Sequence, residues 1–126
     1  TVEDIVSGPG LARIHAFLGG SEQPPETIGQ AALDGNDPLA SETLRLWLEC
    51  YGAFAGDLAM HWLACGGIYL AGGLAAKLLP HVDTQPFIDA FLAKREHREL
   101  VATMPVHALT SEDLGLLGTL AHAASL

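Results

Sequence analysis

Two glycine-rich turns are the features of this sequence whose residue types and spacing could do chemistry. The first is Gly72-Gly73, which ends the apolar run Ile68–Ala71 and leads directly into a helix expected to begin at Leu74. Such a turn places bare backbone amides at the carboxyl end of a strand and at the positive end of a helix, where α/β folds bind ligands. A Cβ would keep a planar base or a phosphate away from the main chain, so glycine suits this position. The pattern indicates nucleotide binding, and an ordinary turn is the alternative.

The second turn is Ser7-Gly8-Pro9-Gly10, which follows the short apolar run Val2–Val6. It is expected to join a strand to a helix, and it again offers amides and a hydroxyl group at a helix N-terminus. The two turns together define the candidate ligand-binding residues, which are Ser7, Gly8, Gly10, Gly72, Gly73 and Leu74.

The remaining polar residues form no pattern typical of a metal or catalytic site. The six histidines share no ligand spacing, and Cys50 and Cys65 have no CxxC partner, so we predict no metal site and interpret both cysteines as reduced, buried thiols. Asp57 and His61 are four residues apart and predict a buried hydrogen-bonded pair on one helix face, with a ligand contact as the alternative. We assign no catalytic residue.

Helices and two strands must position these turns. Strands are predicted at Ile68–Ala71 and Val106–Leu109, and helices at about 11–18, 26–33, 38–65, 74–79, 86–94, 96–102 and 114–126. The order helix, strand, Gly-Gly, helix is typical of an α/β unit with a parallel strand. The helix that starts at Asp37-Pro38 becomes apolar nearly all round, so its C-terminal half is expected deep in the core. The first strand is expected to be fully buried.

Length and composition limit the class of protein. The chain has 126 residues, 49% apolar and 17% charged, which leaves room for one folded domain and excludes extensive disorder. Six basic and 15 acidic residues give a net charge of −9 without a basic cluster, which argues against nucleic acid and anionic membrane surfaces as partners. Leu58–Ala76 has 19 residues without a formal charge, but Gly66-Gly67 and His61 favour a buried helix end and a strand over a membrane span.

Three segments, in order along the chain, resemble the bacterial glucokinase family of the hexokinase-like, actin-fold superfamily. They are Ser7–Leu11, Gly66–Gly73 and Gly115–His122, and Gly56–Ala59 is a further similar stretch. In that family the segment similar to Gly67–Gly73 is the adenosine motif, whose last two glycines lie against the nucleotide. The segment similar to Gly115–Ala121 is a connecting helix at the interdomain hinge. The turn similar to Ser7–Gly10 borders the nucleotide side of the cleft.

The resemblance implies an α/β, helix-rich part of an actin-like (ribonuclease H-like) fold, with residues 1–126 as the C-terminal, large-domain portion of a two-domain enzyme. The start at Thr1 also suggests a fragment. The family's Asp-Gly-Gly-Thr phosphate loop and its sugar-binding Gly-Glu-Gly-Gly-His stretch do not occur in this sequence. The intact protein is implied to be a cytoplasmic, homodimeric enzyme of glycolysis that uses ATP and Mg²⁺ to phosphorylate glucose. This chain would supply the adenosine-binding and hinge parts and would be inactive alone.

Other functions remain open at this point. A sugar-responsive regulator could use the same fold, and a kinase of the family could act on another hexose or on an aminosugar. A dimerisation domain is a third alternative, because the long helix that carries Trp47, Tyr51 and Trp62 could be buried against a second subunit.

Overall fold

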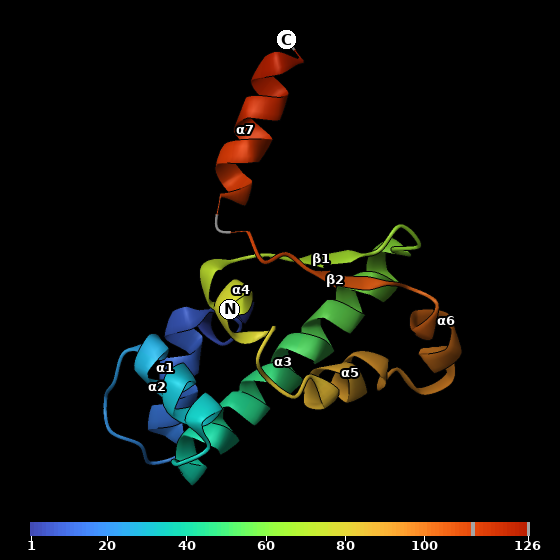
Figure 1. The fold of residues 1–126 in the computed structure, drawn as a ribbon. Helices are drawn as coiled ribbons and strands as arrows, with labels where there is room; N and C mark the ends of the chain where they lie inside the picture. The colour runs from blue at the N-terminus through green and yellow to red at the C-terminus, as the bar shows by residue number, and fades with distance from the viewer. Residues whose placement is uncertain (112, 126) are drawn as a thin grey trace.

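The computed structural model describes residues 1–111 and 113–125, and one long helix organises it (Figure 1). Helix α3 (Pro38–Trp62) has 25 residues, and helices α1, α2 and α5 pack against it. Asp37 caps its start, because the Oδ1 of Asp37 accepts hydrogen bonds from the amides of Leu39 and Ala40 at 2.9 and 3.1 Å. The helix start predicted at Asp37-Pro38 is confirmed.

The other elements are short. In chain order they are the 3₁₀ helix η1 (Val2–Asp4), α1 (Gly8–Phe17), α2 (Pro25–Asp34), β1 (Ile68–Leu70), α4 (Gly73–Leu78), α5 (Gln85–Leu92), the 3₁₀ helix η2 (Arg95–His97), α6 (Arg98–Ala102), β2 (Val106–Ala108) and α7 (Leu114–Ala124). The predicted helices and both predicted strands are found, with shifted ends. The segment predicted as one helix at 96–102 divides into η2 and α6, and Leu126 lies outside the described residues.

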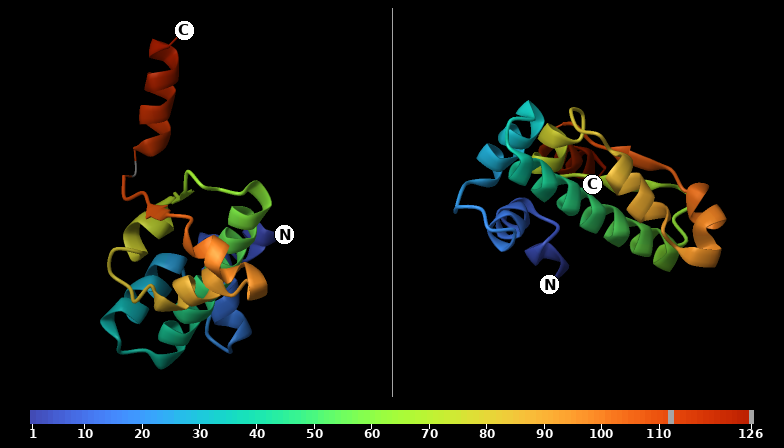
Figure 2. Two further views of the ribbon diagram at one scale, coloured as in Figure 1. Left: turned by 90° about the vertical axis from the view of Figure 1, so that its right-hand side faces the viewer. Right: turned by 90° about the horizontal axis from the view of Figure 1, so that it is seen from below.

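Strands β1 and β2 form a small parallel sheet. Ile68 pairs with Val106, and the register continues to Leu70 opposite Ala108. Helices α4, α5 and α6 connect the two strands, as a parallel pair requires, and the views in Figure 2 agree with this arrangement. The carboxyl ends of both strands point to the same side of the molecule, where α4 and the base of α7 lie (Figure 1).

Helices α3 and α5 approach each other closely because of two glycines. A Cβ at Gly52 would overlap the carbonyl group of Phe87, and a Cβ at Gly56 would come within 2.5 Å of the carbonyl oxygen of Phe91. Lys94, just after α5, also joins the two helices. Its Nζ donates a hydrogen bond to the carbonyl oxygen of Ala53 at 2.9 Å and forms an ion pair with Asp57 at 2.6 Å. These contacts fix α5 along the second half of α3.

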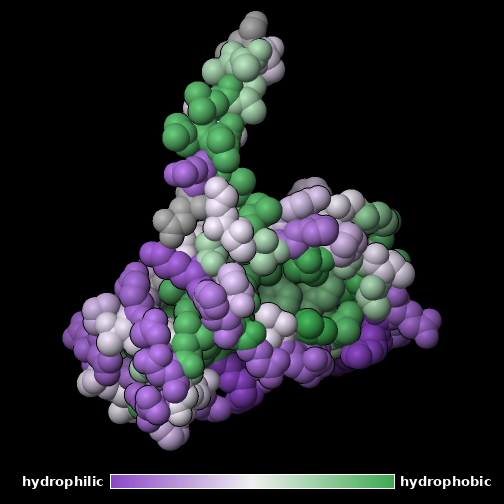
Figure 3. Space-filling model, in the orientation of Figure 1, coloured by the Kyte–Doolittle hydropathy of each residue, from purple (hydrophilic) through white to green (hydrophobic). Residues whose placement is uncertain are grey.

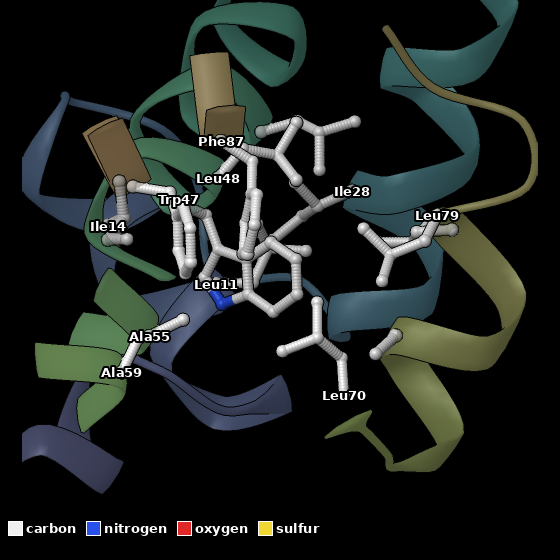
Figure 4. Packing of buried hydrophobic residues seen from close by; sticks show 14 of the residues in the cluster. Leu11, Ile14, Ile28, Trp47, Leu48, Ala55, Ala59, Leu70, Leu79 and Phe87 are labelled. Atoms are coloured by element: carbon white, nitrogen blue, oxygen red, sulfur yellow. The ribbon is translucent and has the colours of Figure 1, made fainter. Parts of the chain in front are cut away.

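The hydrophobic core lies between α3 and the elements that surround it (Figure 4). Trp47 is 2% exposed and lies among Leu11 of α1, Ile28 of α2 and Leu48. Two polar side chains are also buried, and they satisfy each other, because His15 Nδ1 and Thr43 Oγ1 lie 3.2 Å apart. The hydroxyl group of Thr43 donates to the carbonyl oxygen of Leu39, so His15 Nδ1 is the donor of the pair.

Several predictions of local structure and burial are wrong. The run Val2–Val6 contains η1 and a turn instead of a strand, because the amides of Ile5 and Val6 donate to the carbonyl oxygen of Val2 and close a helical turn. The first strand is not fully buried, since Tyr69 is 60% exposed and stacks on His107. The second half of α3 buries one face only, and Trp62 at its end is 73% exposed.

The predictions of burial for the polar and cysteine side chains of α3 are also wrong. Asp57 and His61 are both exposed, and Asp57 pairs with Lys94 instead of with the histidine. Cys50 is half-buried, and Cys65, which follows the end of α3, is exposed. Both cysteines are free, as predicted. Because few elements cover this end of α3, its side chains remain at the surface.

Helix α7 extends away from the rest of the molecule (Figures 1 and 2), and none of its described residues is buried. Figure 3 shows hydrophobic side chains along its lower half. Leu116 and Leu120 of α7 are both exposed. Across residues 1–111 and 113–125, no helix combines the length and apolar composition needed to cross a membrane.

Candidate functional site

The two glycine-rich turns, which are 65 positions apart from Ser7 to Gly72, meet at one small pocket. The pocket has a volume of about 130 Å³ and is lined by Ser7 and Gly8 at the start of α1 and by Gly72, Gly73 and Leu74 at the start of α4. Trp47 and Tyr51 of α3 also line it. Five of the six predicted ligand-binding residues therefore lie around the same space.

Gly10 is the sixth predicted residue, and it does not line this pocket. Its amide donates to the Oγ of Ser7 at 3.0 Å, which caps helix α1. A Cβ at Gly10 would overlap the backbone of Ile5, so glycine at this position is explained by the close approach of η1. The Ser7 hydroxyl is likewise engaged in capping.

Trp47 fixes the first turn to the long helix. Its Nε1 donates to the carbonyl oxygen of Ser7 at 3.1 Å, and the amide of Leu11 donates to the same oxygen at 3.1 Å. Because Trp47 belongs to the buried core, the position of Ser7 relative to α3 is determined by core packing.

The structure gives a reason for glycine at position 72 but not at position 73. Gly72 has φ +128°, a conformation that other residues rarely adopt, so the turn itself requires glycine there. Gly73 has no positive φ, and a Cβ at Gly73 would meet no protein atom within 4 Å. Backbone conformation and packing within the described residues therefore leave glycine at position 73 unexplained. Leu74 lines the pocket and also packs against the core.

A second, larger pocket shares Ala71, Gly72 and Gly73 with the first one. It has a volume of about 660 Å³ and extends to Lys77 of α4, to Ser111 and to the first residues of α7. A volume of this size is within the range of small-molecule sites. The second pocket thus adds an ammonium group and a hydroxyl group to the backbone of the glycine turn.

The electrostatics of the two pockets differ from those of the whole chain. The net charge is −9, yet the residues among 1–111 and 113–125 that line the two pockets include no Asp or Glu. Lys77 is a charged residue in the lining of the larger pocket. This part of the lining therefore adds no negative charge that would repel an anionic ligand at Gly72-Gly73. Among residues 1–111 and 113–125, no three His, Cys, Asp or Glu side chains are grouped so that they could hold a metal ion.

Sequence patterns did not identify several residues that line these pockets. Trp47 and Tyr51 belong to the apolar stripe of α3, and nothing in that stripe separates a pocket residue from a core residue. Lys77 and Ser111 belong to no motif, and they come together only because α4 and the segment after β2 lie at the same end of the sheet. Only the tertiary structure shows that these residues line the pockets.

A ligand-sized space at the carboxyl end of a parallel strand, bordered by the Gly72-Gly73 turn, is the arrangement typical of α/β proteins that bind ligands at this edge of the sheet. Within that class, the chain belongs to the glucokinase family, because the family model described as Glucokinase matches residues 1–126. The resemblance noted in the sequence is confirmed.

Similar proteins agree with this assignment. The chain is 36% identical to the glucokinase of Nostoc sp. (strain PCC 7120 / SAG 25.82 / UTEX 2576), an alignment that covers 100% of the chain and 44% of the relative. It is 39% identical to the glucokinase of Mesorhizobium japonicum, covering 96% of the chain and 37% of the relative. A crystal structure of a glucokinase from an Antarctic psychrotroph matches 98% of this chain and 40% of that chain, with a TM-score of 0.82 and 25% identity. The chain therefore spans less than half the length of these relatives.

Proposed function

We propose that this chain is the adenosine-binding and hinge portion of a glucokinase, which transfers the γ-phosphoryl group of ATP to the 6-hydroxyl group of glucose in glycolysis. The observation that carries the proposal is the convergence of Ser7-Gly8 and Gly72-Gly73 on one pocket in a chain of the glucokinase family. The coverage of 37–45% of its relatives supports a partial chain, and we propose that this chain corresponds to the C-terminal, large-domain part of an actin-like fold.

The residues of this chain would act by binding and positioning. Bound ATP, with Mg²⁺ on its phosphate oxygens, supplies the phosphoryl group, and such transfers depend on alignment and charge stabilisation more than on covalent chemistry from the protein. The Gly72-Gly73 backbone would hold the nucleotide at close range, and Lys77 and Ser111 in the larger pocket suit its phosphates. Trp47 would hold the Ser7 turn in place through its hydrogen bond to the Ser7 carbonyl oxygen.

Helix α7 suits the hinge part of the proposal. It begins at the rim of the larger pocket and carries Gly115 and Gly118, where a Cβ would meet no atom of residues 1–111 and 113–125 within 4 Å. Its apolar side chains are not buried by the described residues. A helix with such a small-residue face can pack closely on another helix. Closure of two domains about it would exclude water from the reacting groups.

The experiment has two arms on the 126-residue chain. In the first, ATP with Mg²⁺ is titrated into ¹⁵N-labelled protein, and the amide signals of Gly72 and Gly73 are expected to shift. The substitution Gly73→Val should weaken ATP binding at least about tenfold, because a branched side chain would fill the space above the turn. Gly66→Val is the matched control, since Gly66 also has open space and no positive φ but lies at the far end of β1.

The second arm measures product. We expect the isolated chain to form no glucose 6-phosphate, because the sugar-binding and phosphate-loop sequences of the family do not occur in it. Unchanged ATP binding by the Gly73→Val variant would remove the proposed site. Formation of glucose 6-phosphate at the rate of a complete glucokinase would show instead that the chain is more than a binding portion.

A further inference from the structure

Tyr51 occupies a position in the smaller pocket that the two glycine turns do not explain. It lies on α3 one helical turn after Trp47, and its side chain lines the pocket from the side of the core. The ring packs edge-on against Trp47, with centroids 5.2 Å apart, and against Phe87, with centroids 5.6 Å apart and planes at 86°. Contacts with two aromatic rings from different helices hold the tyrosine ring in one orientation.

The hydroxyl group of Tyr51 has no hydrogen-bond partner among residues 1–111 and 113–125. The side chain is half-buried, and this burial raises the pKa of the Tyr51 phenol, so the group is a neutral donor and acceptor at neutral pH. No buried polar side-chain atom of the described residues lacks a partner, so the Tyr51 hydroxyl group is accessible from the pocket, where water or a ligand can bond to it. A fixed ring with an open hydroxyl group at a pocket is therefore suited to ligand recognition.

The lining of the pocket indicates which part of a nucleotide would fit there. Within the described part of the chain, the side chains around it are apolar or aromatic apart from the Ser7 hydroxyl, and none of them is charged. That lining suits a base or a sugar better than a triphosphate, whereas the larger pocket on the same glycine turn includes Lys77. The two pockets thus divide the nucleotide into an apolar part and an anionic part.

We infer that Tyr51 is a ligand-contacting residue whose hydroxyl group forms a hydrogen bond with the adenosine part of the bound nucleotide. The inference rests on the proposed function and adds to it the residue that recognises the ligand from the core side.

The test compares Tyr51→Phe with Tyr69→Phe in the 126-residue chain, with adenosine and Mg²⁺-ATP as separate probes. Tyr51→Phe keeps the ring and its contacts with Trp47 and Phe87, so the fold is retained and a thermal melt checks it. Loss of one neutral hydrogen bond should raise the Kd of both probes about 3- to 10-fold. Tyr69→Phe makes the same chemical change on the exposed face of the sheet, where Tyr69 stacks on His107, and should leave both Kd values unchanged.

The amide signals of Gly72 and Gly73 separate failure of this inference from failure of the proposed function. If the probes shift these amides but Tyr51→Phe binds as tightly as the unmodified chain, the inference is overturned and the proposed function stands. An effect on ATP without an effect on adenosine would place the contact at the phosphates and would also overturn the inference. If neither probe shifts the glycine amides, the proposed function fails, and the inference fails with it.

Discussion

Trp47 connects the hydrophobic core to the candidate site. Its ring is among the largest fully buried side chains, and its Nε1 is bonded to the carbonyl oxygen of Ser7. An indole can do both because its apolar body and its single donor point in different directions. The position of the Ser7-Gly8 turn is therefore coupled to core packing, although Ser7 itself is not a core residue.

We predict that Trp47→Phe lowers the free energy of unfolding by about 2 kcal/mol, because it removes the hydrogen bond to Ser7 and leaves a small cavity. Urea denaturation measures the change. Trp62→Phe is the matched control and should cost less than about 0.5 kcal/mol, since Trp62 is exposed. Equal losses in the two variants would contradict the role given to Trp47. ATP binding should weaken in Trp47→Phe, because the turn loses its anchor.

At the scale of elements, α3 and α5 can approach closely because Gly52 and Gly56 of α3 have no side chains. The carbonyl oxygen of Phe87 would lie 2.1 Å from a Cβ at Gly52, and the carbonyl oxygen of Phe91 would lie 2.5 Å from a Cβ at Gly56. These are i and i+4 positions on α3, so both glycines face α5. The close approach also brings Phe87 against Tyr51, which links α5 to the smaller pocket.

We predict that Gly52→Ala destabilises the protein by about 2 kcal/mol, even though alanine is the better helix former. The new methyl group would push α5 away from α3, because a backbone carbonyl cannot rotate aside. Thermal unfolding followed by circular dichroism measures the change. Gly118→Ala in α7 is the control, since its Cβ meets nothing within 4 Å, and there the higher helix propensity should leave stability unchanged or raised. Stabilisation by Gly52→Ala would disprove the close packing.

At the scale of the whole molecule, a large apolar surface remains uncovered. α7 exposes Leu114, Leu116, Leu117 and Leu120, and exposed apolar surface of this extent favours association. The alternative that the long helix dimerises through Trp47, Tyr51 and Trp62 is wrong for Trp47, which is buried within the chain itself. α7 is the better candidate for contact between copies.

We propose that the isolated chain forms a homodimer through α7. Its sedimentation coefficient is expected to rise with protein concentration, because association buries the leucines of α7. The double substitution Leu116→Asp and Leu120→Asp should leave a monomer at every concentration without changing the core. A monomer at high concentration in the unmodified chain, or a dimer that survives both substitutions, would show that α7 is not the interface.

The sequence predicted the elements well, because their signals are local. Asp37 before Pro38 starts α3, glycines end β1, and apolar spacing identifies the helices. The failures concern burial. Tyr69 and Trp62 have the types and the apolar neighbours of core residues, yet both are exposed, because no other element covers them in the described structure. Hydrophobic character indicates which residues can be buried, and the neighbouring elements decide which of them are.

The candidate site also has features that the sequence determines and features that only the tertiary structure determines. The sequence by itself determined the family and the positions of the two glycine turns, because the glycines are visible in the sequence and the φ of +128° at Gly72 is a local requirement of backbone conformation. Only the tertiary structure decided that Ser7-Gly8 and Gly72-Gly73 share a pocket, that Gly10 serves packing, and that Tyr51 lines the same space. These are contacts between segments far apart in the chain, and packing around α3 creates them.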